Sequence, residues 1–224
     1  DIMDYEIDLK ERADRPLTTG LIARNTAILV TIVLFIVGSG LLALVDVRSW
    51  LAGFALIGTI VLYDWWHKTN PLSPVVMGAN RFLVYIAAFV AFSATLNGEV
   101  LGAAGLLWLY IIGLTFIAKS ETQTNFTKYW PAAILFAPAL FFGAQLLDDP
   151  VRLLLVVAFI GWTAYAISFI YQKKQIGGGI VRLIAGVSLF DALALATTGW
   201  TGGVVIALAC FVLTLFFQQY IKGT

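Results

Sequence analysis

Residues 25–45 read NTAILVTIVLFIVGSGLLALV, a run of apolar and small residues without a single charged side chain. The hydrocarbon core of a bilayer is about 30 Å thick, and a helix needs about 20 mostly apolar residues to cross it. The run is long enough for that. It therefore predicts a membrane-spanning helix over residues 24–45.

The composition of the whole chain agrees with this prediction. Of its 224 residues, 60% are hydrophobic and only 12% are charged, and the mean hydropathy is +0.91. Soluble domains carry about 25% charged residues. Too few polar residues remain to build a water-facing surface, so the composition predicts an integral, multi-pass membrane protein.

Similar apolar runs recur along the chain between short polar breaks. They predict about eight spans, near residues 24–45, 48–66, 75–97, 100–118, 129–147, 151–171, 179–198 and 202–221. Strands of a membrane barrel would alternate apolar and polar residues over about ten positions, and these runs do not. The expected fold is an all-α, polytopic helical bundle forming a single domain over residues 1–224. Pro131 and Pro138 fall within one predicted span and should bend it.

Basic residues are distributed unevenly between the two predicted sides. If the spans alternate in direction, one side holds the opening segment, the loops 67–74, 119–128 and 172–178, and the C-terminal tail. The opposite side has only Arg48 and Arg152. Cytoplasmic loops carry an excess of Lys and Arg, so the opening segment is predicted to be cytoplasmic. That side holds Lys10, Arg12, Arg15, Arg24, Lys68, Lys119, Lys128, Lys173, Lys174 and Lys222.

Several classes of function are disfavoured by what the sequence contains. Cys210 is the single cysteine and lies in an apolar run, which excludes a disulfide framework and a thiolate metal site. His67 is the single histidine, and we expect it to be an interfacial neighbour of Lys68 rather than a metal ligand. No basic, aromatic-interleaved soluble face is present, so nucleic acid is not an expected partner.

The opening segment, DIMDYEIDLKERADRPLTTG (residues 1–20), is unusually acidic for so apolar a chain. If it is helical, Asp1, Asp4 and Asp8 are spaced i, i+3 and i+7 and share one helix face. Such carboxylates repel one another unless a cation lies between them, and Mg²⁺ is typically held by one or two carboxylates together with substrate phosphates. The alternative is a solvated loop whose acids pair with the basic residues of the same segment.

The same segment resembles the first acidic motif of the UbiA superfamily of intramembrane prenyltransferases. A second stretch, LYDWWHKTNPLSPVVMGANRFLVY (residues 62–85), resembles that family's segment in which a Tyr and a basic residue lead into the next helix; Tyr63 and Lys68 match it. The resemblance implies two further spans upstream of Asp1. The matched positions in the opening segment are Asp1, Asp4, Asp8, Asp14, Arg15, Pro16 and Gly20.

The resemblance implies a Mg²⁺-dependent transfer of a prenyl group from a polyprenyl diphosphate to an aromatic or hydroxyl acceptor within the membrane. The implied partners are the diphosphate, a hydrophobic acceptor and membrane lipids. The implied metal ligands are Asp1, Asp4 and Asp8. The implied catalytic residues are Asp4, Asp8 and Lys68, and the implied substrate-binding residues are Arg15, Tyr63, Lys119 and Glu121.

One loop departs from the family pattern. The second acidic motif should lie in IAKSETQTNFTKYW (residues 117–130), where Glu121 is the only acid and is flanked by Lys119 and Lys128. This resembles a divergent branch that includes the proteins called EboC. A non-catalytic protein that binds or helps to translocate an isoprenoid or another hydrophobic metabolite is therefore the alternative function. An ion-coupled transporter would need more ionisable residues at mid-membrane depth than Asp191.

Overall fold

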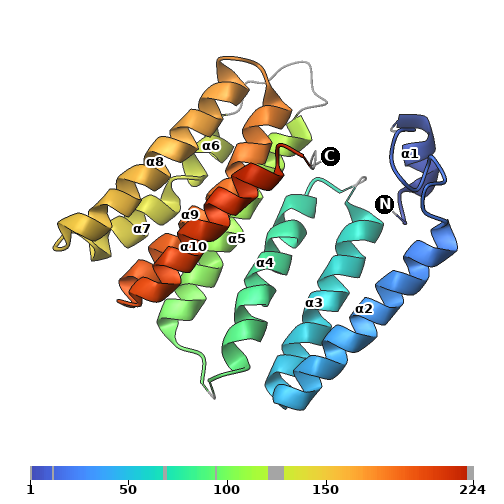
Figure 1. Cartoon of the computed structure of the whole chain (residues 1–224), viewed down its shortest axis with the longest axis horizontal. Helices are drawn as coiled ribbons and strands as arrows, with labels where there is room; N and C mark the ends of the chain where they lie inside the picture. Colours follow the sequence, from blue (N-terminus) through green and yellow to red (C-terminus); the bar gives the residue numbers. More distant parts are fainter. Residues whose placement is uncertain (1, 12, 68–69, 94, 121–128, 221–224) are drawn as a thin grey trace. The chain divides into compact units, whose positions relative to one another are not determined.

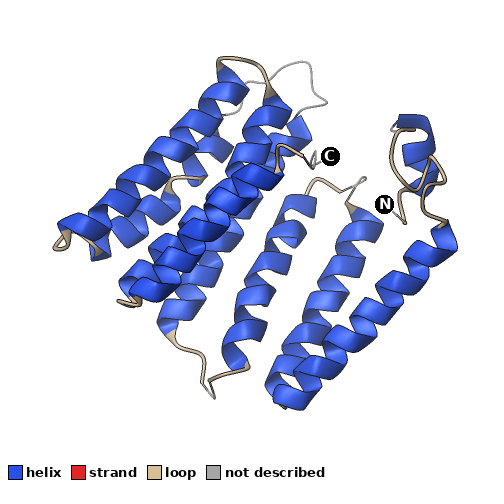
Figure 2. Ribbon diagram, viewed as in Figure 1, coloured by secondary structure: helices blue, strands red, loops and turns tan. Residues whose placement is uncertain are grey.

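The computed structural model describes residues 2–11, 13–67, 70–93, 95–120 and 129–220 (Figure 1). In this part of the chain every regular element is a helix and there is no strand (Figure 2). The all-α prediction is confirmed. The helices are α1 (Tyr5–Glu11), α2 (Arg24–Val45), α3 (Val47–Trp66), α4 (Ser73–Val90), α5 (Gly98–Lys119), α6 (Trp130–Ile134), α7 (Ala137–Gln145), α8 (Pro150–Tyr171), α9 (Ile176–Thr197) and α10 (Thr201–Phe217).

Six of these helices, α2, α3, α4, α5, α8 and α9, are long and apolar enough to cross a membrane. Two further apolar stretches are shorter: α10, and residues 130–145, which α6 and α7 share. Each of the eight expected spans thus corresponds to helical structure. Six have the full length of a span and two fall short of it.

The expected span at 129–147 differs most from the prediction. It is two short helices, because Pro131 and Pro138 each lie in the first turn of a helix instead of bending a single one. Proline has no backbone N–H to donate to the preceding turn, but the first turn of a helix needs none. The N–H of Phe136 donates to the carbonyl of Ala133 in the turn between them.

The expected span at 75–97 ends early, at Val90. The N–H groups of Phe92 and Ser93 both donate to the carbonyl of Phe89, which closes the helix. Asn97 then accepts the N–H of Val100 on its side-chain oxygen, at 2.9 Å, and so caps the start of α5. A polar side chain that binds free N–H groups favours a helix start over a continuing span.

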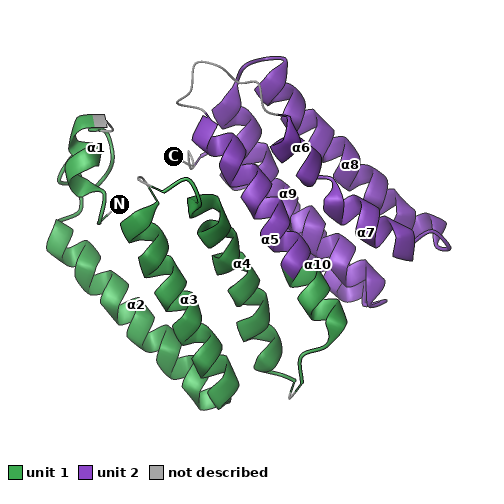
Figure 3. Cartoon of the chain, turned by 180° about the vertical axis from the view of Figure 1, so that it is seen from behind, with its two compact units in different colours: residues 1–104 green, residues 105–224 purple. Residues whose placement is uncertain are grey.

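The described chain separates into two compact units, residues 1–104 and 105–224, with the boundary inside α5 (Figure 3). In unit 1, α3 packs against both α2 and α4. Asp46 makes the turn from α2 to α3, because its N–H donates to Leu42 and its carboxylate accepts the N–H of Arg48. The prediction of a single domain over the whole chain stays a prediction.

In unit 2, α9 packs between α8 and α10 and also contacts α7. The fully buried side chains of unit 2 include Phe159 of α8 and Phe190 of α9. The hydroxyl of Tyr110 on α5 donates to the carbonyl of Leu183 at 2.9 Å, and a Cβ on Gly186 would lie only 2.7 Å from that hydroxyl. Small residues therefore let these helices approach closely, as expected for helices packed in lipid.

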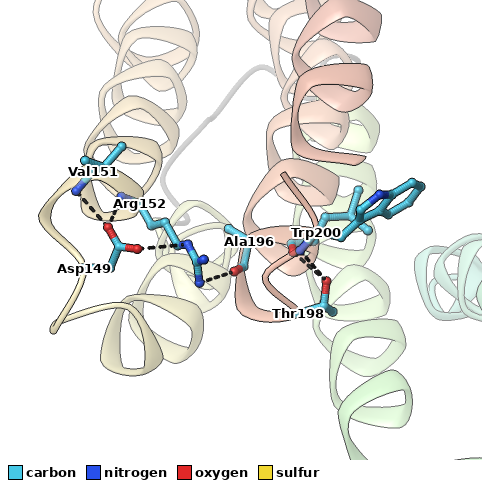
Figure 4. Close-up of polar contacts among 7 residues, drawn as sticks. Asp149, Val151, Arg152, Ala196, Thr198 and Trp200 are labelled. Carbon is cyan, nitrogen blue, oxygen red and sulfur yellow. Dashed lines mark hydrogen bonds and ion pairs between the residues drawn. The ribbon is translucent and has the colours of Figure 1, made fainter. Parts of the chain in front are cut away.

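Asp149 and Arg152 join α8 to the end of α9 (Figure 4). The Asp149 carboxylate accepts the N–H groups of Val151 and Arg152, and it lies 3.0 Å from Nε of Arg152. The guanidinium in turn donates to the carbonyl of Ala196 at 3.2 Å. One of the two basic residues predicted for the side opposite the opening segment thus has a structural role.

Candidate functional site

The acidic opening segment forms α1, a helix of seven residues that starts directly after Asp4. The carbonyl of Asp4 accepts the N–H groups of Ile7 and Asp8, at 2.9 and 2.8 Å. Asp4 therefore lies at the start of α1, one helical turn before Asp8. The acidic segment is helical from Tyr5 onward, as the predicted spacing requires, and Asp4 caps that helix.

Asp8 forms an ion pair with Arg15. Arg15 Nη1 lies 2.5 Å from Asp8 Oδ2, and the two side chains are only 15% and 5% exposed. Arg15 lies in the connection from α1 to α2, so the pair ties α1 to the chain that follows it. A carboxylate this far from water requires a cation or hydrogen-bond donors beside it, and Arg15 supplies both.

Asp4 lies against the end of α3. Its Oδ2 is 3.3 Å from Nε2 of His67, and the two side chains are 15% and 21% exposed. The His67 ring stacks on Tyr63 with 4.9 Å between ring centroids and an interplanar angle of 19°. Tyr63, which the sequence predicted to bind substrate, is thereby brought to the same end of unit 1 as Asp4.

A third contact holds α1 near the start of α2. The guanidinium of Arg24, the first residue of α2, lies over the ring of Tyr5, 5.0 Å from its centroid. The intervening turn is closed by Thr18 and Thr19, whose hydroxyls donate to the carbonyl of Arg15. Gly20 follows with φ +76°, a left-handed conformation that favours glycine. The chain therefore folds α1 back to the end of unit 1 where α2 begins and α3 ends (Figure 1).

These contacts bear on the alternative of a solvated loop. Asp8 does pair with a basic residue of its own segment, as that alternative expects. However, Asp8 is only 3% exposed and the Asp4 side chain only 15%. Both acids are thus withdrawn from bulk water and face other polar groups of unit 1.

Asp4 and Asp8 suit magnesium by their chemistry. Each offers hard carboxylate oxygens, and an ionised carboxylate has about four lone-pair sites, so it can accept hydrogen bonds from the protein and bind a metal ion as well. Within the described residues, no three His, Cys, Asp or Glu side chains are gathered into a group that could hold an ion. Two carboxylates completed by substrate phosphates are a usual way to bind Mg²⁺, so the residues present fit the ion as part of a substrate complex.

The other predicted site residues are placed as follows. Lys119 ends α5 in unit 2 with a partly buried side chain. Asp1, Lys68 and Glu121 lie outside the described residues. The remaining four predicted site residues all lie in unit 1. Asp8 contacts Arg15 directly, and Asp4 lies near Tyr63 through the ring of His67.

His67 is the residue that sequence reasoning missed. It was expected beside Lys68 at the membrane interface, whereas the structure also places it against Asp4. A signal was available, because the chain's single histidine lies within the stretch that carries Tyr63 and Lys68. What the sequence could not supply was the fold of α1 back onto the end of α3.

Comparison with known proteins gives a consistent result. The sequence model of the UbiA prenyltransferase family matches residues 1–175. Three similar curated proteins are each named digeranylgeranylglyceryl phosphate synthase. The protein from Sulfolobus acidocaldarius is 33% identical over 128 residues, 57% of this chain and 43% of that protein. The protein from Methanospirillum hungatei is 24% identical over 202 residues, 86% and 67% of the two chains.

The third relative, from Thermococcus gammatolerans, is 40% identical over 74 residues, 32% of this chain and 25% of that protein. The matched stretches thus span less than half the length of the Sulfolobus and Thermococcus proteins. No solved structure matches the chain.

The family match covers both stretches that suggested the resemblance, α1 with its acids and the end of α3 with Tyr63. The narrower placement in the EboC-like branch stays a prediction. Six long apolar helices and the family match together identify an integral membrane protein. The chain belongs to the UbiA prenyltransferase family.

Proposed function

We propose that this protein transfers a prenyl group from a polyprenyl diphosphate to an acceptor within the membrane, and that the transfer depends on Mg²⁺. The observation that carries the proposal is the pair of largely buried carboxylates, Asp4 at the start of α1 and Asp8 one turn later. Carboxylates with so little access to water favour cations beside them. In a family of prenyltransferases, a Mg²⁺ ion that also binds the substrate diphosphate is such a cation.

The proposed reaction is a substitution at the first carbon of the prenyl chain. The bond from this carbon to the diphosphate oxygen breaks, and both electrons leave with the diphosphate. The acceptor atom forms the new bond and loses its proton to the released diphosphate. The relatives' name describes geranylgeranyl groups carried by glyceryl phosphate, which favours a hydroxyl acceptor over an aromatic one.

The proposed metal ligands are Asp4 and Asp8, joined by Asp1. Magnesium bound there would offset negative charge on the diphosphate as it departs. In this proposal Asp4, Asp8 and Lys68 are the catalytic residues. Arg15 contributes a fixed positive charge next to Asp8, where it also favours an anionic headgroup.

The remaining proposed contacts are Tyr63, Lys119 and Glu121. An aromatic face such as that of Tyr63 stabilises a nearby cation through its quadrupole, which suits the allylic cation that forms when diphosphate leaves. Lys119 would bind phosphate oxygens, and Glu121 is the acid of the second loop. The apolar helices would hold the prenyl tail.

We also propose that the acidic segment faces the cytoplasm, because the predicted loops on its side carry most of the basic residues. A cysteine introduced at exposed Lys174, in a chain with Cys210→Ser, should then react with an impermeant thiol reagent only from the cytoplasmic side of sealed vesicles. Labelling from the opposite side alone would contradict this orientation.

The test of function is diphosphate release by the purified full-length protein. Polyprenyl diphosphates of several lengths would be supplied with Mg²⁺ and candidate acceptors, and chelation of Mg²⁺ should stop the release. Asp4→Asn keeps the shape of the side chain but removes its charge, so we expect at least a 100-fold loss of turnover with an unchanged unfolding temperature. This corresponds to about 2.7 kcal/mol of lost transition-state stabilisation.

Glu6→Gln is the matched control, because Glu6 is an exposed acid on the same helix. It should retain near wild-type turnover. Wild-type turnover in Asp4→Asn would refute the proposed site. No release from any donor by the wild type, together with retained binding of the lipid, would instead favour the non-catalytic carrier.

A further inference from the structure

We propose that His67 is a positioning residue for Asp4: its imidazole holds one carboxylate oxygen of Asp4 and thereby sets the orientation in which this carboxylate binds metal. This inference rests on the proposed function, because it takes Asp4 as a metal ligand. It assigns a role to a side chain that neither the motif resemblance nor the family match singled out. The contact that carries it is the 3.3 Å approach of Nε2 to Oδ2 of Asp4.

The imidazole of His67 is itself firmly placed. Its backbone N–H donates to the carbonyl of Tyr63 at 2.8 Å, which continues α3 by one residue. Its ring stacks on that of Tyr63, and Nδ1 lies 3.2 Å from the carbonyl oxygen of Tyr63 and 3.3 Å from that of Asp64. One ring nitrogen is thus held at the end of α3, and the other faces Asp4.

Asp4, in contrast, depends on tertiary contacts for its position. It precedes a helix of only seven residues, and isolated helices shorter than about 12 residues are marginal in water. It is separated from His67 by more than sixty positions, including all of α2 and α3. An oriented partner at the end of a long helix gives this carboxylate a defined direction that α1 alone could not provide.

The expected size of the effect follows from metal sites in general. Groups that hydrogen-bond to metal ligands fix the ligand's orientation, and their loss typically weakens metal binding 10- to 100-fold. If His67 positions Asp4, its loss should act mainly on metal affinity. If His67 only clamps α1 to α3, its loss should act on stability and on every property of the site alike.

Two substitutions separate these roles. His67→Phe keeps an aromatic ring that can stack on Tyr63 but has no nitrogen to meet Asp4. His67→Gln loses the ring but keeps an N–H donor at nearly the position of Nε2. Trp65→Phe is the control, because Trp65 lies on the same helix and is 75% exposed.

The first readout is the Mg²⁺ concentration that gives half-maximal diphosphate release. We expect His67→Phe to raise this concentration about 10-fold or more, with a smaller change in the rate at saturating Mg²⁺. His67→Gln should restore it to within about 3-fold of wild type, and Trp65→Phe should leave it unchanged. An unchanged value in His67→Phe, or equal losses in the Phe and Gln variants, would overturn the proposal.

The second readout needs no turnover. Binding of Mn²⁺ to the full-length protein in the presence of inorganic diphosphate can be followed by the electron paramagnetic resonance signal of free Mn²⁺. His67→Phe should weaken this binding by the same factor, and its unfolding temperature should match that of His67→Gln. Wild-type affinity in His67→Phe would contradict the role, as would weakened binding that accompanies a lowered unfolding temperature.

The two readouts also separate this inference from the function on which it rests. If the wild type binds Mn²⁺ and His67→Phe weakens that binding, but no prenyl donor is turned over, the enzymatic function fails and the role of His67 stands. If the wild type turns over substrate and His67→Phe has normal metal dependence, the function stands and the role of His67 fails. If the wild type binds no metal, both fail.

Discussion

Asp8 and Arg15 form an ion pair that is almost closed off from water, with side-chain exposures of 5% and 15%. Both residues come from the segment that precedes the first long helix, a part of the chain that could have been wholly solvated. Removing one partner of such a pair leaves a charge with little access to water, which is much less favourable than removing an exposed charge. The pair is therefore expected to hold α1 in place.

Arg15→Gln tests this expectation. We expect the substitution to lower the free energy of local opening of α1 by about 2 kcal/mol, since hydrogen bonds to charged groups contribute about 1.5–3 kcal/mol. Amide hydrogen exchange in α1 should then become about 30-fold faster, because 1.4 kcal/mol corresponds to a factor of ten. Lys10→Gln, at an exposed position on α1, should change these rates little. Equal rates in Arg15→Gln and wild type would show that the ion pair does not hold the helix.

Individual residues also show which features of the site could be predicted from the sequence and which could not. The helix in the acidic opening segment is a local property, and the structure has it from Tyr5 to Glu11. That the acids act from one face stays a prediction. The pairing of Asp4 with His67 depends on a turn that reverses the chain and on the length of two helices. Such a contact is not encoded in any local pattern.

The helices of unit 2 show how small residues set the spacing between elements. A Cβ on Gly179 of α9 would lie 2.2 Å from Cγ1 of Ile170 and 2.9 Å from the backbone oxygen of Ala166, both on α8. Gly161, on α8 itself, has no atom within 4 Å of its would-be Cβ. Alanine substitutions at these two glycines can therefore be compared to measure how much the close packing of α8 and α9 contributes to stability.

Gly179→Ala should lower the unfolding temperature in detergent micelles, whereas Gly161→Ala should maintain or raise it. Alanine stabilises a helix by about 1 kcal/mol relative to glycine. Gly161→Ala should gain this stability without a steric cost, because its added methyl group meets no other atom. At Gly179 the added methyl forces α8 and α9 apart, and overpacking typically costs about 1–3 kcal/mol. A Gly179→Ala protein as stable as Gly161→Ala would contradict the observed approach of α8 and α9.

At the level of whole helices the hydropathy pattern was a good guide, for a clear physical reason. Apolar length decides which segments can cross a membrane, and the boundaries of α2 agree with its prediction. The prediction failed where polar side chains or prolines act locally. α4 ends at Val90, before the predicted end of its span at residue 97, and Asn97 caps the start of α5. Pro138 starts α7 within an apolar run.

For the molecule as a whole, composition predicted a membrane protein, and the order of residues in two short motifs predicted the family. A chain with so few charges has no soluble alternative, and the family match over residues 1–175 agrees with the resemblance drawn from two short stretches. The functional assignment depends on more than either of these. It requires that the carboxylates of α1 act together on one metal–diphosphate complex.

An experimental structure of the full-length protein with Mn²⁺ and inorganic diphosphate would test this requirement. Mn²⁺ takes the same hard oxygen ligands as Mg²⁺ and can be located by its anomalous scattering. We predict a manganese peak at about 2.1 Å from carboxylate oxygens of Asp4 and Asp8, with diphosphate oxygens completing its coordination. A peak bound elsewhere in the protein, or diphosphate bound with both carboxylates turned away from it, would contradict the proposed site.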